Sequence, residues 1–480
     1  MKTSLSTGDL EPLLSVLTES NERFMHQYQG FSGERQPVHT VYGGAHLYSA
    51  ATAEKLGRLA HANLSLYAPN FVMLAKALGF EGAASLPENA AEIQALTNAC
   101  EENPALIKAA NPDAWLAYTV YQRVISKLDS EPVEDNRVDF EDGYGNRPDA
   151  EEDQHAEKAA AAMAEAMENN ALPPNTGIRV KAFTEEARTR AIRTLDLFMT
   201  TLAGKTGGRL PSNFTITLPK VCTVEQVSTL AKLLAMLEQK CGFQIGSIKL
   251  ELMIETTQAV FSPDGRIAIP DLVRAAGGRC ISVAFGTMDY TASCNIASTH
   301  QSHIHPAADF ARHIVQVCLA GTGVFVSDGI TNVMPIAPHR ASEGNPLDQQ
   351  QLAENTRVVH EAWKLHFDNI SSSLRQGYYQ GWDLNPAQIP ARFAAVYYFF
   401  LTGLEDAGAR LKTFIDQAAQ ASMVGNVFDD AATGQGLLNF FLSGIGCGAI
   451  AEAEALTTGI TMDELHSRSF LQIVANRTSP

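Results

Sequence analysis

Apolar runs of strand length alternate with segments of helical periodicity through the middle of the chain. Runs such as ISVAFG (281–286) are apolar throughout instead of alternating with polar residues, which is typical of strands buried on both faces. Between the runs, apolar residues recur every three or four positions, as at Ile192, Leu195, Phe198 and Leu202. Strands that alternate with helices in this way predict βαβ units and a parallel sheet.

Eight runs have the character of strands, and eight parallel strands with helical crossovers match a (β/α)₈ TIM barrel. An open doubly wound sheet is the alternative, but it usually carries a Gly-rich phosphate loop after its first strand, and none stands here. The glycines of GIGCGA (444–449) follow no strand and indicate close helix packing instead. The expected strands lie at 38–43, 137–142, 178–183, 214–221, 248–255, 281–286, 323–330 and within 377–385.

Two segments lie outside a minimal barrel. One follows the first expected strand and the other follows the last, and both have helical periodicity. No internal repeat or low-complexity linker sets them apart, so we expect packed helical additions. The predicted division is an N-terminal segment with the first strand at 1–43, a helical insertion at 44–136, the remaining barrel at 137–389 and a helical extension at 390–480.

The charge balance is acidic. Asp and Glu number 53 against 36 Lys and Arg, which gives a formal net charge of −17. This excess argues against a nucleic-acid groove or an anionic membrane surface, because both need basic patches. It does not exclude a small carboxylate substrate, since one buried arginine or a bound cation can hold such an anion locally.

The cysteines and the N-terminus indicate a cellular compartment. The seven cysteines include no CxxC pair, so we expect reduced thiols and no zinc ribbon. No long apolar run follows Lys2, and no stretch of about 18 uninterrupted apolar residues exists. The sequence therefore predicts a soluble cytoplasmic protein.

Charged residues follow most of the expected strands. The carboxyl ends of the strands form one face of a TIM barrel, and that face carries the chemistry. One such charge is common by chance, because loops are polar, but charges after consecutive strands indicate a shared site. They are Asp139, Glu141 and Asp142 after the second strand, Arg179 and Lys181 in the third, Lys220 after the fourth, Glu255 after the fifth and Asp289 after the sixth.

Glu255 and Asp289 are the candidate metal ligands. Two carboxylates from adjacent strands can converge on one ion, and Mg²⁺ commonly takes one or two carboxylates together with water and substrate oxygens. The alternative is a structural salt bridge to Lys220 or Arg179. Arg179 is also a candidate substrate ligand, since its planar guanidinium can bind a carboxylate through two parallel hydrogen bonds.

A histidine cluster follows the sixth strand. It contains His300, His303, His305 and His313, but it lacks the HExxH spacing, and no cysteine completes a familiar zinc set. We expect these residues to form a loop wall near the pocket and not a transition-metal site.

An ordered set of motifs resembles a known family. VDFED, IRVKAF, LPKV, LMIET, FGTMDY and GYYQGWDLNPAQIP, spread over residues 137–430, are similar to motifs of the citrate lyase β-subunit-like and malyl-CoA lyase-like aldolases. These enzymes belong to the phosphoenolpyruvate/pyruvate-binding TIM barrels. Two departures are the insertion at 44–136 and Asn385, which stands where the family usually has histidine.

The resemblance implies roles for individual residues. Arg179 falls on the family's substrate-binding arginine, and Glu255 and Asp289 fall on its metal ligands, with Mg²⁺ or Mn²⁺ as the ion. Lys220 falls in the LPKV motif, which makes it a second candidate for substrate binding. Glu141 and Asp142 fall on the second-strand motif, where we expect them to orient Arg179 or bound water.

A C-terminal motif implies an acid or base and a partner subunit. GNVFDDA (425–431) is similar to a family segment whose aspartate exchanges protons and often reaches a neighbouring subunit's site, which nominates Asp429 and implies a homo-oligomer. The alternative for Asp429 is that its side chain caps the following helix.

Together, the residues and the resemblance predict a carbon–carbon lyase. It would act on a 2-oxo or hydroxy acid, or on its acyl-coenzyme A ester, through an enolate. One alternative is another enzyme reaction, either malate synthase-like condensation or phosphoryl transfer on an enolpyruvate. The other alternative is a non-catalytic barrel that binds a ligand or a partner.

Overall fold

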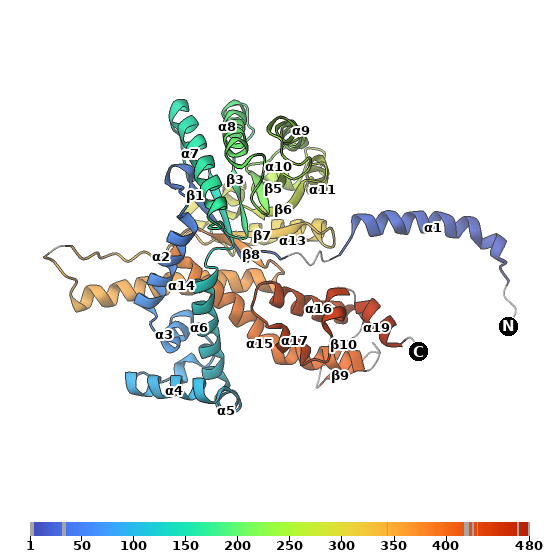
Figure 1. The fold of residues 1–480 in the computed structure, drawn as a ribbon. Helices are drawn as coiled ribbons and strands as arrows, with labels where there is room; N and C mark the ends of the chain where they lie inside the picture. Colours follow the sequence, from blue (N-terminus) through green and yellow to red (C-terminus); the bar gives the residue numbers. More distant parts are fainter. Residues whose placement is uncertain are drawn as a thin grey trace.

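The computed structural model describes residues 4–30, 35–342, 344–416, 422–424, 427–429, 431–467 and 470–478. Eight parallel strands close into a barrel in sequence order, with β8 paired to β1 (Figure 1). The predicted TIM barrel is thus confirmed. The strands are β1 (His39–Gly44), β2 (Asp135–Asp139), β3 (Asn175–Arg179), β4 (Phe214–Leu218), β5 (Lys249–Ile254), β6 (Cys280–Phe285), β7 (Phe325–Ile330) and β8 (Gln380–Asp383).

Helices connect the strands from β2 onward and cover the barrel. Local chemistry sets their ends: α9 starts at a capping box between Thr223 and Gln226 and stops at Gly242, whose φ of 76° is left-handed. These helices are α7 (Asp149–Glu168), α8 (Arg188–Thr206), α9 (Val224–Cys241), α10 (Thr257–Val260), α11 (Ile269–Ala275), α12 (Thr287–Ser293), η3 (Ser298–His300), α13 (Pro306–Leu319) and α14 (Gln349–Arg375).

The segment between β1 and β2 is the predicted helical insertion. Asparagine side chains at positions 70, 89, 103 and 111 cap four of its helices by accepting a hydrogen bond from a first-turn backbone N–H. The elements are η1 (Ala45–Leu47), α2 (Thr52–Tyr67), α3 (Phe71–Leu78), η2 (Ala83–Ser85), α4 (Ala90–Glu102), α5 (Pro104–Ala110) and α6 (Pro112–Ser130).

The segment after β8 is the predicted helical extension, with one addition that the sequence reading missed. A two-stranded antiparallel hairpin, β9 with β10, interrupts the helices. Gly444 permits close packing, because an added Cβ would lie 2.5 Å from Ile450 Cδ1. The elements are η4 (Pro386–Gln388), α15 (Ile389–Asp416), β9 (Ser422–Val424), β10 (Val427–Asp429), α16 (Ala431–Gly446), α17 (Glu452–Leu456), α18 (Met462–Ser467) and α19 (Phe470–Thr478).

The insertion and the extension share one hydrophobic core. Leu64 of α2 and Val124 of α6 belong to the same buried cluster as Trp363 of α14 and Phe393 and Leu411 of α15. A second cluster fills the space between the strands and helices α7–α13. Segments far apart in the sequence therefore form one helical layer on the β1 and β8 side of the barrel (Figure 1).

The N-terminal helix α1 (Thr7–Gln27) stands away from both cores (Figure 1). None of its residues is buried by the described part of the chain. No helix within the described residues combines the length and the apolar character that crossing a bilayer requires.

Candidate active site at the barrel mouth

The carboxyl ends of β2 to β6 bring charged side chains together at one mouth of the barrel. Asp139 and Arg179 are register partners at the ends of β2 and β3. Lys220 follows β4, Glu255 follows β5, and Asp289 lies in the first turn of α12 after β6. Hydrogen bonds and ion pairs connect these side chains across the mouth.

Arg179 is buried and held by Asp139. Its Nε and Nη2 donate to the two carboxylate oxygens of Asp139 at 2.7 and 2.6 Å. Its guanidinium also lies 4.9 Å from the ring centre of Tyr42 and 5.1 Å from that of Trp382. Burial lowers the pKa of Arg179, but Asp139 and Glu141 outweigh burial and raise it, so the side chain stays charged. Asp139 thus occupies the bidentate edge of Arg179, and Nη1 lies 3.2 Å from Glu141 Oε2 and 3.8 Å from Met253 Sδ.

Glu141 joins Arg179 to Lys220. Its Oε2 lies 3.2 Å from Arg179 Nη1, and its Oε1 accepts a hydrogen bond from Lys220 Nζ. Burial raises the pKa of Glu141, and the two cations offset part of this effect. Asp142 accepts a second bond from Lys220 Nζ at 3.0 Å. Glu141 therefore contacts both Arg179 and Lys220, and its orienting role stays a prediction.

Lys220 occupies a backbone conformation that is unusual for lysine. Its φ of 50° lies in the left-handed region. This conformation aims its backbone N–H at Glu255 Oε1, 2.5 Å away, while its Nζ reaches Glu141 and lies 3.9 Å from Asp289 Oδ1. Burial opposes the charge of Lys220, but Glu255, Glu141 and Asp289 raise the pKa above its ordinary value.

Glu255 is a buried carboxylate that accepts few hydrogen bonds. Its residue is 1 % exposed, and burial followed by repulsion from Asp289 raises its pKa to about 7. Gly286 makes room for it, because an added Cβ there would lie 2.5 Å from Glu255 Oε2. Only the Lys220 backbone N–H donates to Glu255 among the bonds within the described residues.

The donor set at Glu255 and Asp289 fits a divalent cation. A cation would offset both the burial of Glu255 and its repulsion from Asp289. No group of three or more His, Cys, Asp or Glu side chains with metal-ligand spacing occurs in the part of the chain that the structure describes. Two carboxylates with open positions suit Mg²⁺ or Mn²⁺, which share their sites with water and substrate oxygens.

The barrel interior beneath the mouth carries polar residues that the sequence reading missed. Glu251 accepts hydrogen bonds from Tyr42, Thr217 and Ser282 at 3.0, 2.9 and 2.8 Å. The indole Nε1 of Trp382 is buried without a hydrogen-bond partner among the described residues. The alternation of faces within each strand was the available signal, since Tyr42 of β1 and Trp382 of β8 contact each other and Arg179.

Several predicted residues lie elsewhere. Lys181 donates to the Phe140 carbonyl and contacts Glu152, and it makes no bond to the mouth cluster within the described residues. Asn385 caps η4 by accepting from the Ala387 backbone N–H. Asp429 ends β10, and its side chain lies outside what the structure describes.

The histidines after β6 have structural contacts. His303 is buried between the Ile330 carbonyl and Ser373 Oγ, at 3.1 and 3.0 Å. His305 caps α13 by accepting from the Ala307 backbone N–H. These contacts fix His303 and His305 within the loop and at the start of α13.

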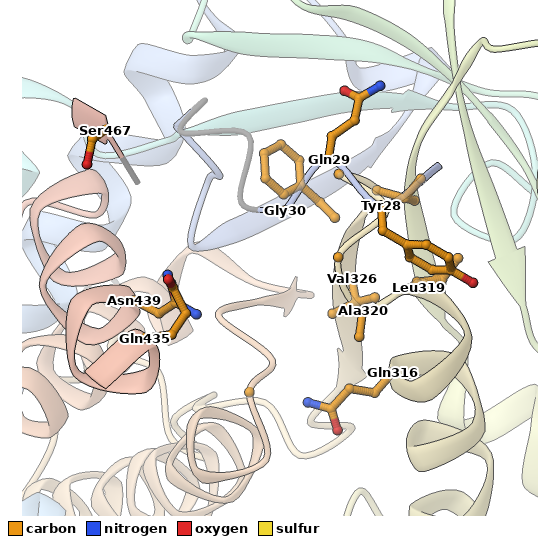
Figure 2. Close-up of a pocket in the computed structure, with 15 residues that line it drawn as sticks. Tyr28, Gln29, Gly30, Gln316, Leu319, Ala320, Val326, Gln435, Asn439 and Ser467 are labelled. Carbon is orange, nitrogen blue, oxygen red and sulfur yellow. The ribbon is translucent and has the colours of Figure 1, made fainter. Parts of the chain in front are cut away.

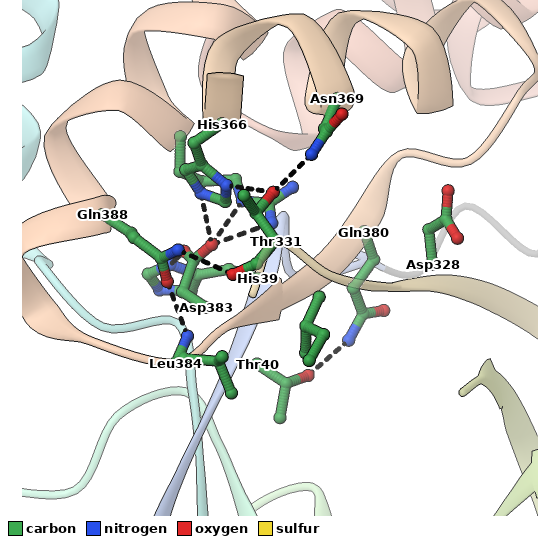
Figure 3. Close-up of polar contacts among 12 residues, drawn as sticks. His39, Thr40, Asp328, Thr331, His366, Asn369, Gln380, Asp383, Leu384 and Gln388 are labelled. Atoms are coloured by element: carbon green, nitrogen blue, oxygen red, sulfur yellow. Dashed lines mark hydrogen bonds and ion pairs between the residues drawn. The ribbon is translucent and has the colours of Figure 1, made fainter. Parts of the chain in front are cut away.

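A second buried acid lies outside the barrel wall. Asp383 of β8 accepts hydrogen bonds from His39, from His366 of α14 and from Arg392 of α15 (Figure 3). Burial raises the pKa of Asp383, but Arg392 and the two histidines reverse this effect and hold it well below its ordinary value. Asp383 therefore joins the barrel to the helical layer as a fully paired anion.

Fold and mouth together define a TIM-barrel protein with a charged opening at the carboxyl ends of its strands. The chain belongs to the family described as Domain of unknown function (DUF6986), whose profile matches residues 17–473. No curated protein sequence matches it.

Two solved structures are similar to this chain. A citrate lyase from Burkholderia xenovorans LB400 has a TM-score of 0.51 at 17% identity, over 71% of this chain and 92% of that chain. A malate synthase from Haloferax volcanii, at 3 mM glyoxylate, has a TM-score of 0.41 at 15% identity, over 59% of this chain and 75% of that chain. The citrate lyase supports the barrel architecture at this identity and nothing finer.

Proposed function

We propose that the protein is a Mg²⁺- or Mn²⁺-dependent carbon–carbon lyase, acting on a 2-oxo or hydroxy acid or its acyl-coenzyme A ester through an enolate. The observation that carries this proposal is the contact set at the mouth: buried Glu255 beside Asp289, with Lys220 bonded to one carboxylate and near the other. The protein with the citrate lyase name supports it only through the shared fold.

Each residue has a definite task under this proposal. Glu255 and Asp289 would hold the cation, which when bound supplies a Lewis acid that stabilises negative charge on an enolate oxygen. Arg179 and Lys220 would attract the substrate carboxylate through their positive charge, with Arg179 fixed in place by Asp139 and Glu141. Glu141, bonded to both cations, would keep them oriented toward the substrate.

A proton must also move when the carbon–carbon bond breaks, because the enolate carbon is protonated on release. Asp429 is proposed for this step on the family resemblance alone. Asp429→Asn should lower turnover while leaving Mn²⁺ affinity unchanged. A variant with wild-type turnover would remove Asp429 from the mechanism.

The test combines metal binding with product analysis. Glu255→Gln should weaken Mn²⁺ binding, followed by electron paramagnetic resonance, by about 100-fold, in line with the loss of one of two charged ligands. Glu185→Gln is the control, since Glu185 is exposed and pairs only with Arg188 among its described contacts. Equal Mn²⁺ affinity in wild type and Glu255→Gln would overturn the proposed site.

Incubation of the wild-type protein with Mg²⁺, pyruvate, glyoxylate and acetyl-coenzyme A would then identify the reaction. Because a lyase also runs in reverse, a hydroxy-acid product from pyruvate and glyoxylate supports the aldolase proposal. Condensation of acetyl-coenzyme A with glyoxylate to a product that keeps the thioester would support the lyase on an acyl-coenzyme A ester. Release of free coenzyme A with a free hydroxy acid would replace the lyase with a synthase. Tight metal binding without any product would leave a binding protein as the conclusion.

A further inference from the structure

Helix α1 exposes a continuous apolar stripe. Leu13 is 69 % exposed, Leu17 is 53 % exposed and Phe24 is 61 % exposed. An isolated helix of this kind gains most of its stability in water from packing of its apolar face. Nothing within the described chain packs on this face, so the helix lacks the contact that such a pattern normally serves.

The stripe follows a heptad. Leu10, Leu17 and Phe24 are seven residues apart, and Leu14 and Asn21 form a second series offset by four residues. The two series correspond to the d and a positions of a coiled coil, in which apolar residues recur at an average spacing of 3.5. We call these five residues the α1 seam. Pro12 falls at an f position, on the outer side of the helix.

We propose that α1 pairs with α1 of a second copy of this chain as a parallel, in-register, two-stranded coiled coil. In that arrangement each a residue faces its own copy, so the two Asn21 amides meet and can hydrogen-bond to each other. An antiparallel pair would place each Asn21 opposite an apolar d residue and leave the amide unsatisfied. Asn21 thus selects a second copy in one register.

The distribution of charge agrees with self-association. Asp9, Glu11, Glu19, Glu22 and Arg23 all lie off the α1 seam, so the seam itself is uncharged although the chain has a net charge of −17. Four carboxylates against one guanidinium on the helix also disfavour an anionic lipid surface. The apolar face therefore fits another copy better than a membrane.

The base of α1 is anchored away from the barrel mouth. The Gly30 backbone N–H donates to the Gly321 carbonyl at 2.9 Å. Tyr28 and Gly30 line a cavity of about 680 Å³ together with Ala320 and Val326, next to the amino end of β7 (Figure 2). Pairing through α1 would thus join two copies on the side opposite the mouth and leave both mouths open.

Sedimentation equilibrium of the full chain tests the proposal. Wild type should have twice the chain mass of 51.8 kDa at micromolar concentration. The double variant Leu14→Glu with Leu17→Glu should dissociate to 51.8 kDa, with a dimer dissociation constant raised by about 100-fold or more, because each charge enters the seam twice. Val16→Glu is the matched control: Val16 is 67 % exposed on the same helix but lies off the seam, so the dimer should persist.

Asn21→Leu separates a specific coiled coil from general hydrophobic association. The variant should still associate but form species above the dimer, because the polar a residue that limits the oligomer is gone. A wild-type mass of 51.8 kDa, or an unchanged dimer in the Leu14→Glu, Leu17→Glu variant, would overturn the proposal. Pelleting of a monomeric wild-type chain with anionic vesicles would do the same and assign α1 to a membrane. Mn²⁺ binding at the mouth should be equal in wild type and in all three variants.

Discussion

Glu255 and Asp383 are two buried acids of the same barrel with opposite electrostatics. They are 1 % and 0 % exposed, yet the pKa of Glu255 is raised to about 7 and the pKa of Asp383 is held well below its ordinary value. Burial disfavours the charge on both, so the difference comes from their partners. Asp383 is paired with positively charged and hydrogen-bonding groups of the fold, whereas Glu255 has too few such partners to offset its burial.

Asp383 owes its pairing to fixed donors. The Nε2 atom of His39 accepts the Glu134 backbone N–H at 3.1 Å, so its Nδ1 carries the proton that Asp383 accepts. His366 lies between Thr331 and Asp383, and burial lowers the pKa of His366. With Arg392 added, the carboxylate meets donors from a strand and two helices. Asp383, paired on all sides, thus has a structural role, whereas the underpaired Glu255 is the acid whose charge the proposed cation would offset.

The largest expected effect comes from removing the charge of the paired acid, Asp383. Asp383→Asn leaves Arg392 buried without its anion and should lower the free energy of unfolding by about 3–5 kcal/mol. Urea denaturation measures this, with the exposed Asp264→Asn variant as control. A loss below about 1 kcal/mol would mean that the Asp383 network does not hold the helical layer on the barrel.

The second effect has the opposite sign. Glu255→Gln removes a buried, underpaired charge. At pH 8 and without metal, the free energy of unfolding of the variant should therefore be about 1–2 kcal/mol higher than that of wild type. Urea denaturation in the presence of a chelator gives this value. Marked destabilisation would show that Glu255, like Asp383, is a structural anion.

The two acids should also respond oppositely to pH. An unfolded glutamate titrates near 4.5, whereas folded Glu255 holds its proton until about 7, so its contribution to stability falls as pH rises between these values. Asp383 contributes stability above its unfolded pKa near 3.8 and loses it as pH falls through the much lower folded pKa. Because Glu255 must release its proton, Mn²⁺ affinity should fall by up to about ten-fold per pH unit below 7. A flat affinity between pH 5.5 and 8 would contradict this linkage.

The smallest effect concerns the backbone at Lys220. Its φ of 50° suits glycine, so Lys220→Gly should be about 1 kcal/mol more stable than Lys220→Ala. Both variants lack the ammonium group, and both keep the N–H that reaches Glu255. They should therefore weaken oxalate binding in the presence of Mg²⁺ equally, by calorimetry. Equal stability would show that the left-handed backbone is not strained.

Much of the mouth was predictable because parallel strands end on one face. Arg179, Lys220, Glu255 and Asp289 could be placed there from the alternation of strands and helices alone. The pairing within the mouth could not be predicted. Asp139 was one charge among several in VDFED, and nothing in the sequence indicates that it takes the bidentate edge of Arg179.

The partners of Asp383 could not be predicted from the sequence either. Its partners come from positions 39, 366 and 392, which only the closed barrel and its helical layer bring together. Tyr42 and Trp382 were also missed, because their contact requires β1 to pair with β8, the two ends of the barrel.

The shared core of the insertion and the extension has a consequence for synthesis. Helices α2–α6 leave the ribosome early, but they pack against α15, which is made some 260 residues later if counted from Ser130 to Ile389. During that interval these helices can pack on one another, but the apolar faces that contact α14 and α15 have no partner within the nascent chain, and β1 lacks its neighbour β8. Because exposed apolar surface favours aggregation, we expect this protein to fold largely after translation and to depend on chaperones while the chain is incomplete.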